Sequence, residues 1–330
     1  MMVKQKKDKI LKVNNNIKKV KIMEEEWDYL IILDACRYDY FENIWKKYFK
    51  EELKGELTKK ISVGSSTVEW RDNSFKEYYD DVIYISSNPY INSNMYVNGF
   101  LGTEHFNKVY DVWADYWDEK IGTVLPETVT NTAIDIIKSN KNKRFIIHYL
   151  QPHAPYLSLN ATSKGFPPPD LKSGKVLCGV KEEEKISKLN EIINILSGIF
   201  KKIGVMGNNP GWKLREFFNM PPASPMDAIK REYGKEGLRK TYFDNLEIVI
   251  QQVLILLDHL SGRIVVTSDH GELLGEQGCY SHEPGSTNPY LVEIPWLEIY
   301  KGRREIIYRD VSEKARIKGK IKSLKSLGKV

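Results

Sequence analysis

Cysteine is scarce in this sequence of 330 residues, which holds only Cys36, Cys178 and Cys279. Their spacing matches neither a zinc knuckle nor a Cys-x-x-Cys redox pair, and an odd, sparse set forms no disulfide framework. The scarcity excludes a small scaffold held together by disulfides. It favours a reducing compartment, and we therefore expect a cytoplasmic protein.

Long apolar runs are missing as well. No stretch reaches the roughly 18–20 apolar residues that a membrane-spanning helix needs. The lysine-rich first residues lead into Asn14, Asn15 and Asn16 rather than into the apolar segment of a signal peptide. We therefore expect neither a transmembrane helix nor a secretory leader.

Acidic residues are rare at both ends of the chain and common between them. Residues 1–21 carry eight lysines against one aspartate, and residues 301–330 carry eleven lysines or arginines against three acidic residues. Because the whole chain has a net charge of only +6, residues 22–300 carry −9. An acidic body argues against a broad nucleic-acid-binding face. The chain divides into a basic N-terminal arm (1–21), a central domain (22–300) and a basic C-terminal tail (301–330).

The C-terminal tail has a sparse helical pattern. Four of its apolar residues recur at steps of four, three and three, namely Ile317, Ile321, Leu324 and Leu327. On a helix they form one stripe among lysines, and such a helix can rest on an anionic membrane surface. Gly319 and Gly328 weaken the helix. Peripheral contact with the inner face of a membrane and a solvated tail are therefore both open interpretations.

Apolar runs alternate with helical patterns along the central domain. Five segments predict strands: 29–33, 59–63, 82–85, 144–149 and 263–267. Four segments show apolar residues at helical spacing: 38–49, 68–79, 128–137 and 246–260. This alternation predicts an α/β fold with a mostly parallel sheet and helices on both faces. The stretch 158–240, with a helical segment near 183–203, does not follow this alternation of strands and helices. We expect it to be an insertion beside the active site.

Two acidic residues lie just past predicted strands. Asp34 follows the strand that ends at Leu33, and Asp269 and His270 follow the strand at 263–267. In open parallel sheets ligands bind beyond the carboxyl ends of the strands, so adjacent strands would bring these side chains together. Two carboxylates and an imidazole are suitable ligands for Zn²⁺, Mn²⁺ or Mg²⁺. The alternative is that Asp34 caps the following helix and Asp269 forms a turn.

A hydroxyl-rich turn at residues 64–67 joins a predicted strand to a predicted helix. A hydroxyl there can bind a metal ion and attack phosphorus, because metal coordination lowers the pKa of the alcohol. The amino end of the helix adds partial positive charge for an incoming anion. An ordinary helix cap is the alternative, and the pattern alone favours it. Among the hydroxyls we choose Thr67, since it immediately precedes the helix.

Two histidines lie in loops that also contain proline. His153 belongs to Gln-Pro-His-Ala-Pro-Tyr at 151–156, and His282 belongs to Tyr-Ser-His-Glu-Pro-Gly at 280–285. A loop histidine is usually a surface residue, so neither one indicates a site by itself. Arg37, close after Asp34, can neutralise a substrate anion or pair with Asp39 to brace the loop, and pairing is slightly favoured.

Taken together and in this order, these segments resemble the sulfatase-like branch of the alkaline phosphatase superfamily. The most specific part is Ser-Asp-His-Gly-Glu at 268–272 with Gly-Glu at 275–276, and Pro-His-Ala-Pro-Tyr at 152–156 is the next. Asp34 after a strand and Thr67 at a strand–helix turn complete the pattern. The resemblance covers roughly residues 26–300 apart from the insertion.

The resemblance implies a fold and a set of roles. The fold would be the three-layer α/β sandwich of alkaline phosphatase, with its site at the carboxyl edge of the sheet. Asp34, Asp269 and His270 would bind a metal ion, and Thr67 would be both a ligand and the nucleophile. His153 and His282 would hold the anionic oxygens of the ester substrate. Arg37 would join them if its guanidinium binds the anion instead of pairing with Asp39.

Departures from the family pattern narrow the function. True sulfatases need a Cys/Ser-x-Pro-x-Arg motif, but residues 65–69 lack its Pro and Arg, and Ala35 replaces a second Asp found in many sulfatases. The Asp-x-x-x-His pair of two-zinc phosphatases is not found near His153. The resemblance therefore implies one divalent cation per chain, and Mn, Zn, Mg and Ca are all open alternatives. A Thr nucleophile with one metal is similar to the phosphoglycerol and phosphoethanolamine transferases of cell envelopes.

We therefore predict a metal-dependent hydrolase or transferase that acts on phosphate or sulfate esters through Thr67. Two alternatives stay open: a catalytically inactive sulfatase-like binding protein, and a true sulfuric ester hydrolase. The sequence does not decide between water and an alcohol as the final acceptor, and it leaves the substrate and the oligomeric state open.

Overall fold

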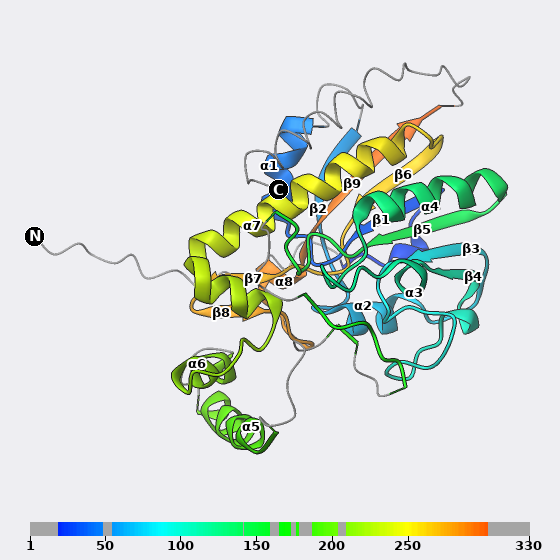
Figure 1. The fold of residues 1–330 in the computed structure, drawn as a ribbon. Coiled ribbons are helices and arrows are strands. Elements are labelled where there is room, and N and C mark those ends of the chain that lie inside the picture. Colours follow the sequence, from blue (N-terminus) through cyan, green and yellow to red (C-terminus); the bar gives the residue numbers. More distant parts are fainter. Residues whose placement is uncertain are drawn as a thin grey trace, which may run out of the picture.

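In the computed structural model, the apolar runs of the sequence meet in one seven-stranded sheet (Figure 1). The structure describes residues 19–48, 55–140, 142–158, 165–172, 176–177, 187–203 and 209–302. Nearly all of the basic N-terminal arm, almost the whole C-terminal tail with its predicted membrane helix, and Cys178 lie outside these residues. Cys36 and Cys279 are free thiols.

The sheet is mostly parallel, as predicted. Its strands follow one another in the order β2 (Gly55–Ile61), β9 (Glu293–Lys301), β6 (Gly262–Thr267), β1 (Tyr29–Leu33), β5 (Arg144–Tyr149), β3 (Tyr79–Ser86) and β4 (Phe106–Asp111). Only β9 runs against its neighbours, and the other neighbouring pairs are parallel. Ile32 of β1 pairs with His148 of β5 on one side and with Thr267 of β6 on the other. The three central strands therefore end level with one another.

Helices cover both faces of the sheet, which confirms the predicted three-layer α/β class. One face packs against α1 (Tyr38–Tyr48), α4 (Pro126–Ser139) and α7 (Pro225–Leu257), and the other packs against α2 (Thr67–Ser74) (Figure 1). Ile31 points into the first layer and Ile32 into the second, because successive side chains of a strand alternate. A central strand buried on both faces needs apolar residues throughout, which explains the continuous run in β1.

Smaller elements decorate this frame. They are η1 (Ile22–Glu24), η2 (Gly102–Glu104), α3 (Val112–Tyr116), α5 (Ser187–Lys202), α6 (Pro210–Phe217), the hairpin of β7 (Leu273–Glu276) and β8 (Cys279–Ser281), and α8 (Pro289–Val292). Helices α5 and α6 belong to the predicted insertion, and Figure 1 shows them below the sheet, away from its other helices. Among the described residues, no helix is both long and apolar enough to cross a lipid bilayer.

Some element bounds differ from the sequence prediction. The strand predicted at 59–63 is β2 (Gly55–Ile61), an edge strand whose polar residues hide the pattern. The helix predicted at 68–79 ends at Ser74, because Phe75 turns into the core against the ring of Trp70. The helix predicted at 246–260 begins as early as Pro225 and bends at Gly234, whose φ of 69° is left-handed.

Helix α7 fixes the loop that follows β1. The buried hydroxyl of Tyr242 donates to the carbonyl of Ala35 over 2.7 Å and accepts from the backbone N–H of Arg37 over 3.0 Å. Ala35 has a φ of 58°, a left-handed conformation that costs about 1 kcal/mol or more for a residue with a Cβ atom. The hydrogen bonds of Tyr242 on both sides of Ala35 hold the loop in this conformation.

Replacement of Tyr242 by Phe should therefore destabilise the fold. The change leaves a buried carbonyl and a buried N–H without their partner, which should lower the free energy of unfolding by about 1–3 kcal/mol. Tyr40→Phe is the matched control, since it removes the same atom from a ring that packs edge-on against Tyr242, and it should cost less than about 0.5 kcal/mol. Urea unfolding of the two variants measures both values, and equal values would contradict a role for the Tyr242 hydroxyl.

Candidate active site

Asp34, Asp269 and His270 meet at the carboxyl edge of the sheet. Asp34 follows β1, and Asp269 and His270 follow β6, which pairs with β1 in parallel. One ligand atom from each of the three side chains lies within 4.8 Å of the others, and all three residues are buried. Nε2 of His270 is 3.4 Å from Oδ2 of Asp269 and 3.9 Å from Oδ1 of Asp34. The rule that places ligands beyond the ends of parallel strands therefore selects residues that are close in space.

We call Asp34, Asp269 and His270 the first group. In each of its two carboxylates, hydrogen bonds fix one oxygen and the other oxygen faces the centre of the group. Oδ2 of Asp34 accepts a hydrogen bond from the Asn88 amide over 2.6 Å. Oδ1 of Asp269 accepts from the backbone N–H groups of Ala35 at 3.0 Å and His270 at 2.9 Å. In the alternative interpretation, the Asp269 side chain only forms a turn. Its hydrogen bonds to backbone N–H groups use Oδ1 alone. Oδ1 of Asp34 and Oδ2 of Asp269 face the centre of the group.

The ring of His270 is oriented in the same way. Its Nδ1–H donates to the carbonyl of Gly271 over 2.7 Å, which leaves the lone pair of Nε2 for the two carboxylates. Burial lowers the pKa of His270, although the charge of Asp269 acts in the opposite direction. A neutral imidazole with a fixed tautomer is the form that binds a metal ion.

Asp34 is further surrounded by histidine. Burial alone would raise the pKa of its carboxyl, but the contact with His148 and the charges of His153, His148 and His270 lower it well below its usual value. Nε2 of His148 is 3.4 Å from Oδ2 of Asp34, and its Nδ1 is 2.7 Å from the hydroxyl of Tyr84. Asp34 is therefore held as a carboxylate.

Sequence reasoning missed both of these neighbours of Asp34. Asn88 follows β3 at the same edge of the sheet, so the rule that selected Asp34 could have found it. His148 lies inside the apolar strand β5, where a histidine is itself unusual.

Thr67 is the hydroxyl that reaches the group. It is the first residue of α2, its Oγ1 donates to Oδ2 of Asp269 over 2.8 Å, and the same oxygen is 3.2 Å from Nε2 of His270. The other two hydroxyls of the turn are engaged elsewhere. Ser66 accepts from the N–H of Glu69 at 3.4 Å as the helix cap, and Ser65 donates to the carbonyl of Glu283 at 2.7 Å. The helix-cap alternative therefore applies to Ser66 and not to Thr67.

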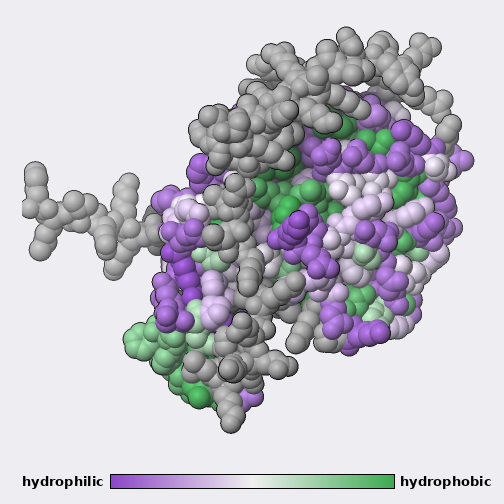
Figure 2. Space-filling view, in the orientation of Figure 1, coloured by the Kyte–Doolittle hydropathy of each residue, from purple (hydrophilic) through white to green (hydrophobic). Residues whose placement is uncertain are grey.

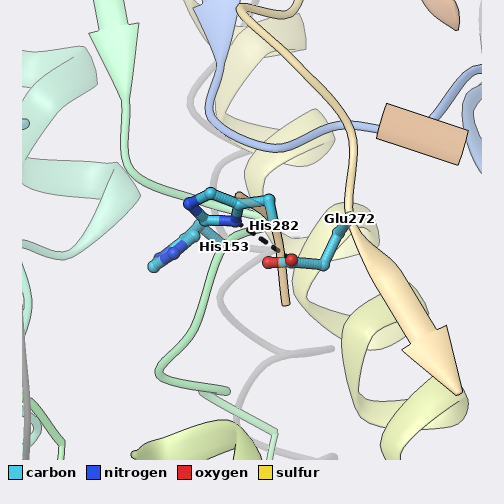
Figure 3. A group of neighbouring side chains, drawn as sticks. All are labelled: His153, Glu272 and His282. Atoms are coloured by element: carbon cyan, nitrogen blue, oxygen red, sulfur yellow. Dashed lines mark hydrogen bonds and ion pairs between the residues drawn. The ribbon is translucent and has the colours of Figure 1, made fainter. Parts of the chain in front are cut away.

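A second group adjoins the first and contains both loop histidines (Figure 3). It consists of His153, Glu272 and His282, again with one ligand atom each within 4.8 Å. Nδ1 of His282 donates to Oε1 of Glu272 over 3.0 Å. The ring of His282 lies 4.2 Å from that of His270 and 5.4 Å from that of His153, between centroids. The structure therefore brings all the predicted histidines together, and it adds Glu272, which the sequence marked only as part of a motif.

Glu272 also sets the charge of its neighbour. Burial by itself would lower the pKa of His282, but the adjacent carboxylate of Glu272 raises it to about 8. Since Nδ1 of His282 is bound to Glu272, its other ring nitrogen, Nε2, does not take part in this bond. His153 is fixed similarly, with Nδ1 donating to the carbonyl of Ala154 over 2.7 Å.

Asn245 on α7 holds the loop that carries His153. Its Nδ2 lies within hydrogen-bonding distance of three loop carbonyls, those of Pro152 at 3.3 Å, His153 at 3.2 Å and Pro155 at 3.0 Å, and its Oδ1 accepts from the N–H of Leu157 at 2.7 Å. One buried side chain thus replaces the regular hydrogen bonds that a proline-containing loop cannot make.

Arg37 lies with acidic partners next to the second group. Its guanidinium is buried and donates to Asp39 through Nε at 2.9 Å and Nη2 at 2.7 Å, and to Glu276 through Nη1 at 2.8 Å. Nη1 also donates to the carbonyl of Glu272 over 3.3 Å. Of the two interpretations of Arg37, this geometry favours the brace over a direct contact with the substrate.

A comparison with protein families finds a match to most of the chain. The family model described as Sulfatase matches residues 62–303. This chain belongs to the sulfatase family. It is therefore an enzyme of phosphate- or sulfate-ester chemistry, and the predicted family is confirmed. The matched part of this sulfatase-family chain contains Thr67 and both groups of histidines, whereas Asp34 precedes it and joins the site through the fold.

Several solved structures are similar to the chain. The soluble domain of lipooligosaccharide phosphoethanolamine transferase A from Neisseria meningitidis is 15% identical with a TM-score of 0.44, and the match covers 83% of this chain and 75% of that chain. The periplasmic domain of EcEptC from Escherichia coli, in complex with Zn, is 13% identical with a TM-score of 0.45 and coverages of 88% and 78%.

A third is the phosphonate monoester hydrolase of Agrobacterium radiobacter, at 11% identity, a TM-score of 0.45 and coverages of 83% and 67%. Likeness at this level does not extend to the substrate. No curated protein sequence matches the chain.

Proposed function

We propose that the chain is a metal-dependent hydrolase or transferase of phosphate esters with Thr67 as its nucleophile. The observation that carries the proposal is the position of one hydroxyl. Oγ1 of Thr67 lies 2.8 Å from a carboxylate oxygen of Asp269 and 3.2 Å from Nε2 of His270. Ser65 and Ser66 are bonded to other partners, so Thr67 alone among the hydroxyls of the turn is directed at the group.

The first group suits a divalent cation. Its donors would be Oδ1 of Asp34, Oδ2 of Asp269, Nε2 of His270 and Oγ1 of Thr67. The donor set of two carboxylates, an imidazole and a hydroxyl is appropriate for Zn²⁺ or Mn²⁺, whereas Ca²⁺ takes oxygen ligands almost alone. When bound, such a cation supplies positive charge that favours the ionised hydroxyl and attracts the anionic ester.

The residues of the chain then account for a double displacement. The Thr67 oxygen forms a bond to phosphorus, and the ester oxygen leaves with the electron pair of its own bond. The nearest acceptor for the Thr67 proton is Oδ2 of Asp269. Water or an acceptor alcohol later attacks the same phosphorus and loses its proton. The bond to Thr67 then breaks, and its electron pair together with a proton restores the Thr67 hydroxyl. The choice of acceptor separates a hydrolase from a transferase.

Two histidines would bind the oxygens of the transferred group. His153 and His282 both use Nδ1 for a protein partner, which leaves Nε2 for the substrate. Donors fixed before the reaction stabilise the charge that develops on a phosphoryl group at no cost in reorganisation. Glu272 and Asn245 are positioning residues in this scheme, since they act through His282 and through the loop of His153.

The proposal includes the organisation of the chain. Residues 22–300 would form the catalytic domain, and the insertion at 158–240 would select the substrate. One cation per chain is proposed, at the first group, and the cytoplasm is the proposed compartment. A true sulfuric ester hydrolase is the second candidate, favoured only by the family itself. Turnover of nitrophenyl phosphate, a nitrophenyl phosphodiester and nitrophenyl sulfate would separate the two activities.

Loss of one ligand should remove the metal ion without unfolding the chain. Asp269→Asn keeps an oxygen for its backbone partners, and it should lower metal occupancy and activity to background, as should His270→Ala. The expected cost to the fold is about 1 kcal/mol. Asp135→Asn, at an exposed position of α4, is the control and should behave as wild type. Elemental analysis after dialysis and circular dichroism measure the two quantities, and full metal occupancy in both site variants would refute the ligand assignment.

Removal of the Thr67 hydroxyl should stop turnover and leave most of the metal in place. We expect Thr67→Ala to lower kcat at least about a thousandfold, because a nucleophile has no substitute. Ser66→Ala is the matched control: it should lose about 1 kcal/mol of stability with the helix cap and keep its turnover. Steady-state kinetics with a nitrophenyl ester tests both. An inactive Ser66→Ala beside an active Thr67→Ala would show that the wrong hydroxyl has been chosen.

A further inference from the structure

Helix α5 is apolar over a wider arc than its neighbour covers. Ile193 is buried against Leu214 and Met220 of the segment that contains α6. A second row of apolar residues lies beside Ile193 and is exposed to solvent. Its members are three, four and four residues apart in the sequence, and each side chain is at least 50% exposed: Ile192, Ile195, Ile199 and Ile203. Such spacing places the first three on one stripe of the helix surface. Ile203 directly follows α5 and extends the stripe, because its N–H donates to the carbonyl of Ile199 over 3.1 Å.

The end of α6 also carries exposed apolar side chains. Phe217, 81% exposed, and Phe218 stand at the end of that helix and stack edge-on at 5.2 Å. Within the described part of the chain, every other large hydrophobic side chain that is exposed belongs to a tyrosine. We call the four isoleucines and two phenylalanines the α5–α6 face. Figure 2 shows its green atoms gathered at the lower left, where Figure 1 places these two helices.

The charge around the α5–α6 face differs from that of the rest of the body. Residues 187–220 hold five lysines or arginines against two glutamates, whereas residues 22–300 as a whole carry −9. Of the charged side chains that the structure describes in this segment, Lys202, Lys213 and Glu191 are exposed, Glu216 pairs with Lys230, and Arg215 is buried. Exposed apolar side chains in a segment with an excess of cations are the arrangement with which helices lie in the surface of an anionic bilayer.

A second copy of the chain fits this face less well. In a two-fold dimer the α5–α6 faces of two chains would contact each other, so the lysines beside one face would lie near those beside the other. The apolar gain would be opposed by repulsion between like charges. Anionic lipid offers the opposite charge and a hydrophobic layer at once.

We propose that the α5–α6 face docks on the surface of an anionic phospholipid bilayer. Docking would also affect the position of the active site, because the segment that contains α6 contacts elements of the site. Trp212 of α6 lies 5.7 Å from the ring of Tyr280, two residues before His282, and Arg231 of α7 donates to the carbonyls of Trp212 and Met220. Docking would thus hold the segment that carries His282 close to the lipid surface. The proposal does not depend on the nature of the ester or on the role of Thr67.

Co-sedimentation of the full chain with vesicles tests the proposal. Vesicles of phosphatidylglycerol mixed with phosphatidylcholine should bind the wild type, and phosphatidylcholine alone should bind it weakly. Ile195→Asp with Phe217→Asp should lower the partition coefficient about tenfold or more, because two side chains lose the ability to insert. Tyr78→Asp with Tyr116→Asp is the control of equal charge, at positions that are 56% and 53% exposed, and it should bind as wild type.

A neutral pair, Ile195→Ser with Phe217→Ser, separates lost insertion from charge repulsion and should also lower binding. Circular dichroism and the hydrolysis of a soluble nitrophenyl ester, both unchanged, would show that the variants are folded. Wild type that stays in the supernatant at low salt would overturn the proposal, as would face variants that bind like the control. A dimer of wild type that the face variants convert to monomers, without any vesicle binding, would assign the face to a second copy instead.

Discussion

The burial of two carboxylates and an imidazole at one point of the sheet edge is the constraint on which the site depends. Asp34, Asp269 and His270 are withdrawn from solvent, and unpaired charge in such a place costs several kcal/mol. The fold satisfies one oxygen of each carboxylate with a fixed donor, the Asn88 amide or the N–H of Ala35. The remaining oxygens face each other across the position where we place a divalent cation.

That arrangement is maintained by a helix far away in the sequence. Tyr242 and Asn245 are three residues apart on α7, so they share one face of the helix. Tyr242 binds the loop that follows β1 and Asn245 binds the loop that follows β5. The N–H of His153 also donates to the carbonyl of Asp34 over 3.2 Å. The sheet register therefore sets which residues meet, and α7 sets how far apart the two loops stand.

Much of this architecture could be predicted from the sequence, for identifiable reasons. The central strands are buried on both faces, so their apolar runs are continuous, and Asp34 and Asp269 stand out because each ends such a run. The individual hydrogen bonds that fix the site were harder to predict. Asn88 follows β3 at the same sheet edge as Asp34, but the sequence does not show that its amide binds Oδ2 of Asp34, 54 positions away. The start of β2 was hidden because an edge strand carries polar residues.

The central claim is that a bound cation and the Thr67 hydroxyl act at one place. Metal analysis of the purified wild-type chain, combined with ester hydrolysis before and after chelation, tests it most directly. The account predicts about one ion per chain, loss of hydrolysis when a chelator removes it, and recovery on adding Zn²⁺ or Mn²⁺. A metal-free chain that hydrolyses the ester at the undiminished rate would contradict the account.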